Sequence, residues 1–504
     1  MYLIPEPQIW KKTEDIFLLD YTVRIVLDRS CPQEGLFYAQ LLREEAEQYA
    51  GAAPAVTRHA GDGRAIVMRV RESVLCDHAA PCGTEALCDH AAPCGTEALL
   101  DDAALCEQAY HLTVTETTVT VTGGGVKGLL YGVQTLRQMI RQQGAALPGC
   151  EITDYPQMKT RGYYLDVTRG RIPTMEYLKK VIDRLAFYKY NQLQLYVEQS
   201  YQFEDLSEVW RDDTPLTAED MLEIDAYCAK YQIDLVPSLS CFGHLYKILR
   251  TKGYHRYCEL EGTREEPFSF IDRMDHHTID VSNKESIGLV KQWILEYMPL
   301  FRSEYFNICA DETFDLGKGK SREAAEKLGT ERLYIDHVKE LCEFVKEQGK
   351  IPMFWGDIIC RFPEAVRELP QETVCLTWGY EKDQDDESVR LMKEAGARQY
   401  CCPGVCGWNQ FANRLDIAYE NIRRMCSYAF QYDAEGVLVT DWGDFGHINH
   451  PEFSVPAMIY GSACTWNTVY TKNNPSHEEL NRQISALEYG DRTESLADLA
   501  EQLG

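Results

Sequence analysis

Two adjacent carboxylates at the end of an apolar run are the residues of this chain best suited to chemistry. The run covers residues 305–310 (Tyr-Phe-Asn-Ile-Cys-Ala), and Asp311 and Glu312 follow it directly. A carboxylic acid can protonate a leaving oxygen while a neighbouring carboxylate orients the attacking group. An isolated Asp-Glu pair is more often solvated surface charge, because loops are rich in polar residues. The elements that position the pair therefore decide between the two interpretations.

Strand-like and helix-like segments alternate eight times after about residue 159. The expected strands cover residues 161–167, 191–197, 233–240, 305–310, 351–356, 373–378, 398–405 and 436–440. Eight β-α units in succession favour an α/β fold with a closed (β/α)8 TIM barrel. An open doubly wound sheet is the alternative, but it would carry a glycine-rich phosphate loop after its first strand, and residues 165–170 lack one.

Two helices of this region have recognisable start signals. Thr217 with Asp220, and Ser282 with Glu285, have the spacing of a capping box. In that arrangement a hydroxyl group and a carboxylate satisfy the first N–H groups of the helix. We therefore expect helices to begin directly after Thr217 and Ser282. A further amphipathic helix is expected over residues 175–190.

The carboxyl ends of the expected strands carry an unusual set of polar and aromatic residues, as the active end of a barrel would. In chain order they are Asp166, Glu198, His244, Asp311, Glu312, Trp355, Asp357, Trp378, Tyr380, Trp408, Trp442 and Asp444. Flat aromatic groups suit the apolar face of a pyranose ring, and carboxylates suit its hydroxyl groups. Each residue also has a plainer interpretation: tryptophans are often core, and buried histidines or carboxylates often pair with other side chains. Their recurrence at the strand ends favours a sugar-binding mouth.

The first 150 residues have the pattern of a small α+β domain. Alternation of polar and apolar residues predicts strands at 17–26, 65–70 and 110–121. A helix is expected after them, with one face formed by Leu129, Val133, Leu136 and Ile140. Residues 144–158, which contain two glycines and two prolines, are expected to link this domain to a barrel over 155–470. Residues 471–504 are polar and are expected to form a C-terminal helical extension.

A perfect tandem repeat lies inside the first domain, where residues 76–87 recur as 88–99. Its thiol and imidazole groups suit zinc, and they belong to Cys76, His78, Cys82, Cys88, His90 and Cys94. Their spacing matches no finger or ribbon pattern. A duplicated surface loop is the favoured interpretation, because surface loops tolerate insertion. No metal site is expected.

Charge and composition argue against several classes of function. The 504 residues carry a formal net charge of −28. Such a chain repels nucleic-acid phosphates and anionic membrane surfaces, whereas a neutral sugar is not repelled. Residues 1–12 lack the pattern of a signal peptide, no apolar run approaches a membrane span, and the 19 scattered cysteines suit reduced thiols. These features predict a cytoplasmic protein.

Three stretches of the chain resemble glycoside hydrolase family 20, the β-N-acetylhexosaminidases. Residues 128–138 are similar to the helix that closes that family's small N-terminal domain. Residues 152–156 and 161–169 resemble its entry into the first barrel strand. Residues 306–312 resemble its catalytic signature, in which a small residue precedes Asp-Glu. The likeness extends from about residue 110 to 470.

The resemblance implies a substrate-assisted, retaining hydrolysis of terminal β-linked GlcNAc or GalNAc on an oligosaccharide or glycoconjugate, without a metal or organic cofactor. Glu312 would be the general acid/base. Asp311 would hold the acetamido group, whose carbonyl oxygen attacks the anomeric carbon to form an oxazolinium ion. Substrate contacts would come from Arg161, Glu198, His244, Trp355, Trp378, Tyr380, Trp442 and Asp444, with Arg161 on the outer hydroxyl groups and the tryptophans as walls.

Several positions depart from the family pattern. Glu198-Gln199 replaces Asp-Asp, Phe242 replaces proline, and Gly356-Asp357 replaces Asp-Glu, which suggests a divergent branch with a different linkage or leaving-group preference. A sugar-binding protein that has lost turnover is the alternative from another class, and retention of both Asp311 and Glu312 argues against it. The related O-GlcNAc-removing family uses two aspartates, so Glu312 argues against that family. The sequence does not decide the oligomeric state, and a homodimer is one alternative.

Overall fold

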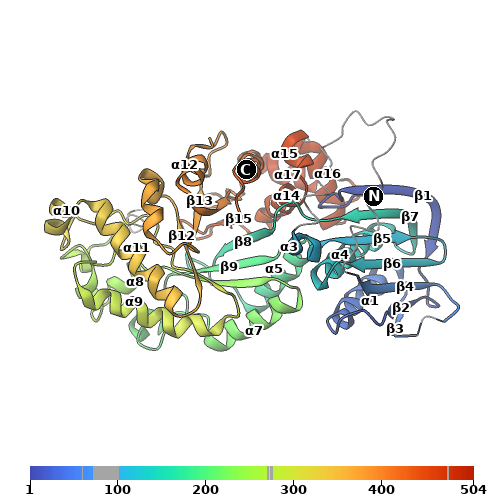
Figure 1. Cartoon of the computed structure of the whole chain (residues 1–504), viewed down its shortest axis with the longest axis horizontal. Coiled ribbons are helices and arrows are strands. Elements are labelled where there is room, and N and C mark those ends of the chain that lie inside the picture. The colour runs from blue at the N-terminus through green and yellow to red at the C-terminus, as the bar shows by residue number, and fades with distance from the viewer. Residues whose placement is uncertain (60, 72–101, 270–271, 273–275, 474–475) are drawn as a thin grey trace.

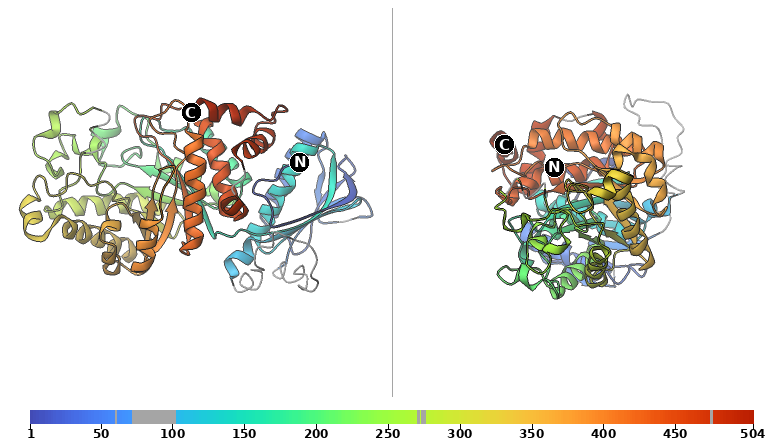
Figure 2. Two further views of the ribbon diagram at one scale, coloured as in Figure 1. Left: turned by 90° about the horizontal axis from the view of Figure 1, so that it is seen from above. Right: turned by 90° about the vertical axis from the view of Figure 1, so that its left-hand side faces the viewer.

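The computed structural model describes residues 1–59, 61–71, 102–269, 272, 276–473 and 476–504. An N-terminal sheet with its helices lies at one end of the long axis and a barrel fills the rest (Figure 1). The C-terminal helices lie against the barrel on the side that faces the sheet (Figure 2). The tandem repeat at 76–99 lies outside the described residues, so its expected loop character stays a prediction.

The N-terminal domain is a mixed sheet of seven strands in the order β1-β7-β5-β6-β4-β2-β3. The strands are β1 (Ile9–Leu18), β2 (Arg24–Leu27), β3 (Ala55–Thr57), β4 (Ala65–Val70), β5 (Tyr110–Val114), β6 (Thr118–Gly123) and β7 (Ala146–Asp154). The helices are α1 (Gly35–Ala50), α3 (Ala103–Gln108) and α4 (Val126–Gln143). The expected apolar face of α4 is confirmed, because Leu129, Val133, Leu136 and Ile140 are all fully buried in the core.

Three expectations for this domain were wrong in detail. Residues 17–26 do not form one strand, because Asp20 accepts the Thr22 N–H in a turn between β1 and β2. Residues 110–121 form a hairpin whose turn is closed by the Thr115 N–H donating to the Thr118 carbonyl. Residues 144–158 are largely strand β7, which pairs with both β1 and β5 in spite of its Pro148 and Gly149. Pairing with β1 on both sides of this point, and with β5 from Cys150 onward, outweighs the weak strand propensity of those two residues.

The expected (β/α)8 barrel is confirmed as a closed ring of parallel strands in the order β10-β11-β12-β13-β14-β15-β8-β9. They are β8 (Thr160–Asp166), β9 (Gln192–Val197), β10 (Asp234–Leu239), β11 (Tyr305–Asn307), β12 (Ile351–Trp355), β13 (Val374–Trp378), β14 (Arg398–Cys402) and β15 (Gly436–Asp441). All of these strands are almost completely buried, as parallel strands covered on both faces must be.

Helices cover the outside of the barrel. They are α5 (Met175–Phe187), α6 (Ser207–Trp210), α7 (Ala218–Lys230), α8 (Tyr246–Leu249), α9 (Lys284–Tyr297), α10 (Arg322–Leu328), α11 (Thr330–Glu347), α12 (Glu387–Ala395), α13 (Leu415–Gln431) and α14 (Val455–Trp466). The connection from β12 to β13 has only the 3-10 turns η5 (Ile359–Arg361) and η6 (Pro363–Glu368). Three more helices follow: α15 (Val469–Asn473), α16 (His477–Glu488) and α17 (Leu496–Leu503).

The expected helix starts are confirmed at one position and wrong at the other. Thr217 and Asp220 form the capping box of α7 through both of its hydrogen bonds. Helix α9 instead begins one residue later than expected, because the Asn283 side chain accepts the Glu285 N–H. Asn is as good a cap as Ser, so the two neighbouring candidates differ little in energy.

The N-terminal domain is joined to the amino-terminal end of the barrel through buried polar contacts. The Lys189 ammonium group, which precedes β9, lies 3.2 Å from the Asp154 carboxylate at the end of β7. The Gln138 side chain of α4 donates to the Ile4 carbonyl and to the Phe187 carbonyl at the end of α5. None of the described helices is long and apolar enough to span a bilayer.

Candidate active site

The paired carboxylates stand at the carboxyl end of β11, at the mouth of the barrel. The strand is shorter than expected because Cys309 and Ala310 have positive φ angles of 58° and 68°, which end the strand geometry after Asn307. Glu312 also has a positive φ, 49°. Residues other than glycine and asparagine rarely adopt this conformation, and it costs about 1–3 kcal/mol where the surroundings impose it. The backbone here is therefore held by its contacts.

His244 is the residue that joins the two carboxylates. Its Nε2 lies 3.4 Å from Asp311 Oδ2 and 3.3 Å from Glu312 Oε2. Burial disfavours the imidazolium, but Asp311 and Glu312 outweigh it and hold the pKa of His244 well above its ordinary value. Burial likewise disfavours a charged Asp311, but His244 and Arg169 lower the pKa of this carboxyl. The site therefore holds an imidazolium against an ionised Asp311 at neutral pH.

Asp357, which follows β12, lies on the other side of the pair. Its Oδ2 accepts the backbone N–H of Glu312 at 3.1 Å. Its Oδ1 is buried and has no hydrogen-bond partner among the described residues. Burial, with a contribution from Asp311, raises the pKa of Asp357 to about 8. This group is therefore an uncharged carboxylic acid at neutral pH.

Arg169, beyond the end of β8, is the centre of a second cluster. Its guanidinium group pairs with Asp444 and lies 3.1 Å from Glu198 and 3.7 Å from Asp166. It also donates to the Tyr196 hydroxyl at 3.2 Å. Burial opposes the charge, but Asp444 and the other carboxylates hold the pKa of Arg169 well above its ordinary value. A fixed cation with carboxylates around it is suited to binding several hydroxyl groups in one orientation.

Aromatic side chains from β13 and β15 form the remaining wall. Trp378 and Tyr380 stack with ring centroids 5.0 Å apart, and Trp442 donates its indole N–H to the Tyr380 hydroxyl at 2.7 Å. Trp355 has no exposed surface and packs 5.4 Å from Trp442. The structure thus places Trp355 beneath the wall, where it supports Trp442, and not on the surface of the pocket.

These groups line a small pocket at the barrel mouth, with a volume of about 50 Å³, that opens to solvent. Of the residues expected at the site, the structure brings Asp311, Glu312, Trp378, Tyr380, Trp442 and Asp444 to its lining, and Arg169 joins them. Glu198 and His244 are not part of this lining, but each contacts a residue that is: Glu198 contacts Arg169, and His244 contacts the two carboxylates. Paired carboxylates, a buried arginine and aromatic walls in one pocket can bind a single sugar ring and transfer a proton to it.

Arg161 lies outside this group, which corrects the expectation that it contacts the outer hydroxyl groups of a sugar. It stands at the start of β8, whereas the pocket is at the strand's end. Its guanidinium donates to the carbonyls of Met158 and Lys189 and to the Tyr131 hydroxyl of α4. Arg161 is therefore a contact between the barrel floor and the N-terminal domain.

Arg169 was not singled out from the sequence as a site residue, and Asp166 and Asp357 were noted at strand ends without a role at the site. Arg169 and Asp166 stand at the end of the first barrel strand, and Asp357 at the end of the fifth. Their positions past strand ends were a usable signal for all three. What the sequence could not supply was the contact between Asp357 and the Glu312 backbone, which depends on the local turn.

A closed barrel with paired carboxylates at its mouth is the arrangement of a barrel glycosidase. Comparison with family models agrees with this class. "Glycosyl hydrolase family 20, catalytic domain" matches residues 159–483, and "Glycosyl hydrolase family 20, domain 2" matches residues 1–155. The chain belongs to glycosyl hydrolase family 20.

Individual relatives are distant. A β-hexosaminidase of Akkermansia muciniphila is 33% identical over 157 residues, which is 27% of this chain and 32% of that protein. The chain matches similarly small parts, 22% and 38%, of two further curated relatives. These matches are too partial to carry the activity of the whole relatives over to this chain.

Solved structures resemble the chain over nearly its whole length. An exo-β-N-acetylglucosaminidase from Vibrio harveyi, in complex with N-acetylglucosamine, gives a TM-score of 0.73 at 16% identity and covers 99% of this chain and 78% of that one. A β-N-acetylhexosaminidase from Streptomyces coelicolor gives 0.72 at 18% identity, covering 97% and 96%. At these identities the likeness shows the shared fold.

Proposed function

We propose that the protein is an exo-acting β-N-acetylhexosaminidase that removes terminal β-linked GlcNAc or GalNAc by a substrate-assisted, retaining mechanism. The observation that carries this proposal is the contact of His244 with both Asp311 and Glu312 at the pocket. It leaves one carboxylate ionised and a second within reach of a leaving oxygen. The relatives named above are described as hexosaminidases, which supports the same reaction.

In the first step Glu312 donates its proton to the glycosidic oxygen as the bond to the anomeric carbon breaks. The acetamido carbonyl oxygen of the substrate forms the new bond to that carbon, which gives an oxazolinium ion. Asp311 accepts the acetamido N–H and stabilises the positive charge that develops on the ring. Its Oδ1 is buried without a partner among the described residues, so an acceptor is free for this contact.

In the second step Glu312 takes a proton from water, which attacks the anomeric carbon and opens the oxazolinium ring. Two displacements at one carbon give net retention of configuration. Arg169, with Asp444 and Glu198, lines one side of the pocket and would hold the hydroxyl groups of a terminal sugar. A pocket limited in this way favours removal of end residues.

The test is hydrolysis of an aryl β-N-acetylglucosaminide beside the matching aryl β-glucoside, with Glu312→Gln and Asp311→Asn as controls. Cleavage of the acetamido sugar alone, lost in both variants, is the expected result. Equal cleavage of both sugars would remove the role assigned to Asp311. Binding of GlcNAc without any cleavage by folded protein would instead favour a sugar-binding function on the same fold.

A further inference from the structure

Asp357 has contacts that the reaction described above does not use. Its carboxyl accepts the N–H of Glu312, the residue whose side chain must reach the leaving oxygen. That N–H belongs to a residue with a positive φ, in a segment where Cys309 and Ala310 also have positive φ. No other acceptor for this N–H is present among the described residues. The bond from Asp357 to the Glu312 N–H and the bond from the Phe314 N–H to the Glu312 carbonyl together hold the unfavourable backbone at Glu312, and the first of them comes from a side chain.

The surroundings of Asp357 disfavour a negative charge on it. One N–H reaches Oδ2, no donor in the described part of the chain reaches Oδ1, and the nearest charged groups include the ionised Asp311. His244 acts in the opposite direction but is engaged by the catalytic pair. The titratable groups that face Asp357 from the neighbouring elements are Asp311, Glu312, His244, Tyr334, Cys360 and Cys375.

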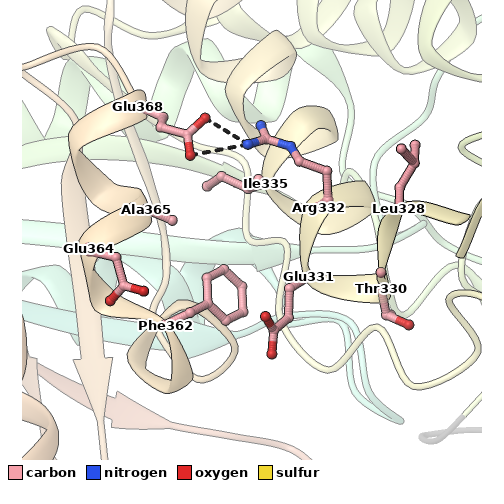
Figure 3. A pocket seen from close by; sticks show the side chains of 10 residues that line it. Leu328, Thr330, Glu331, Arg332, Ile335, Phe362, Glu364, Ala365 and Glu368 are labelled. Carbon is pink, nitrogen blue, oxygen red and sulfur yellow. Dashed lines mark hydrogen bonds and ion pairs between the residues drawn. The ribbon is translucent and has the colours of Figure 1, made fainter.

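A groove behind the catalytic segment gives this carboxyl a route to solvent. Its inner part is lined by Asp357 together with Thr313 and Phe362, and carries the charged side chains of Lys318, Glu331 and Arg361. Its outer part shares Glu331 and Phe362 with the inner part. Figure 3 shows this outer part, where Phe362 lies beside Glu364 and below the Arg332–Glu368 ion pair. Because Asp357 lines this groove, its carboxyl can exchange protons with water.

We propose that Asp357 is a positioning residue that acts as an uncharged carboxylic acid: it holds the Glu312 backbone, and so places the acid side chain, without adding a third negative charge to the site. This inference deepens the proposed function and rests on it. The pKa of about 8 agrees with the geometry. An amide has the same shape and the same acceptor oxygen, so asparagine should replace aspartic acid below that pH.

The experiment compares Asp357→Asn and Asp357→Ala with the wild-type protein on an aryl β-N-acetylglucosaminide between pH 5 and 9. We expect kcat of Asp357→Ala to fall about 10- to 100-fold with KM little changed, because a small displacement of a catalytic group has that effect. Asp357→Asn should follow the wild-type profile below pH 8 and diverge from it only above. Loss of activity in Asp357→Asn equal to that in Asp357→Ala at pH 6 would overturn the proposal, since it would require a charged group.

A control separates positioning from simple loss of a buried hydrogen bond. Asp280, before α9, also accepts a backbone N–H, from Ser282, and is buried, but it does not line the pocket. Asp280→Ala should lower stability and leave kcat unchanged. If it lowers kcat as much as Asp357→Ala does, the proposal fails.

Crystal structures of the two Asp357 variants keep the inference testable even if the wild-type protein cleaves no acetamido sugar. In Asp357→Ala the Glu312 carboxyl should lose its 3.3 Å approach to His244, and in Asp357→Asn it should keep it. An unchanged Glu312 in Asp357→Ala would overturn the positioning role. Absence of cleavage together with a displaced Glu312 would count against the proposed function alone.

Discussion

The Nε2 atom of His244 lies 3.4 Å from Oδ2 of Asp311, and both side chains are almost fully buried. Each group shifts the other toward its charged form, which burial alone would oppose. A buried ion pair of this kind is costly to break from one side, because the remaining charge is left without a partner. The pair therefore links the stability of the barrel mouth to its chemistry.

His244→Gln should be less stable than the wild-type protein by an amount that depends on pH. The folded pKa of His244 lies above its ordinary value of 6.5, so its contribution is complete below about pH 6 and is lost as the pH rises through the folded pKa. Urea unfolding at pH 5.5 and at high pH measures this. A difference that grows with pH would contradict the assigned charges.

Asp357→Asn should be at least as stable as the wild-type protein at pH 7. A carboxyl with a folded pKa of about 8, against 3.8 ordinarily, binds more protons in the folded state, so stability falls as the pH rises between those values. Asparagine removes this penalty. The unfolding midpoint of the variant, measured relative to that of the wild-type protein, should therefore be higher at pH 8 than at pH 5. A variant that becomes less stable relative to the wild-type protein between these pH values would refute this account.

Arg169→Ala should abolish tight sugar binding and destabilise the fold. The substitution leaves Asp444, Glu198 and Asp166 close together without their cation. Removing one partner of a buried ion pair costs about 3–5 kcal/mol. Urea unfolding and GlcNAc titration check the two effects, with Arg169→Lys as the variant that keeps the charge. If Arg169→Lys binds GlcNAc as weakly as Arg169→Ala, the bidentate geometry matters more than the charge.

Arg161→Met should reduce stability and leave kcat/KM of the folded protein unchanged. The guanidinium satisfies carbonyls at Met158 and Lys189, and each buried group left without its partner costs about 1–3 kcal/mol. Unfolding and aryl-glycoside assays on the same preparation measure both quantities. A lower kcat/KM at unchanged stability would contradict this prediction and would indicate that Arg161 contacts the sugar.

The sequence was sufficient for the barrel and for most of its mouth. Fully buried parallel strands appear as continuous apolar runs, and the residues that follow them lie at one end by topology. The same logic should have excluded Arg161, because it opens a strand. From Arg161 to Asp166 there are five steps of about 3.3 Å, so the two ends of that strand are roughly 17 Å apart. The family motif spans both ends, and it obscured the difference between Arg161 and Arg169.

Other features could not be read from the sequence. The early end of β11 depends on positive φ angles at Cys309 and Ala310, which neither residue type favours. The pKa of Asp357 depends on burial and on a neighbour 46 positions away, Asp311. Such properties arise from tertiary contacts that override local preference.

The interface between the N-terminal domain and the barrel has a consequence for how the chain unfolds. Lys189 and Arg161 belong to the barrel, but their partners Asp154 and Tyr131 belong to the domain before it. A barrel cut free of residues 1–155 would leave the Lys189 ammonium group without its carboxylate and the Arg161 guanidinium without its Tyr131 partner. The two domains should therefore melt together in a single calorimetric transition, and neither should be obtainable as an independent folding unit.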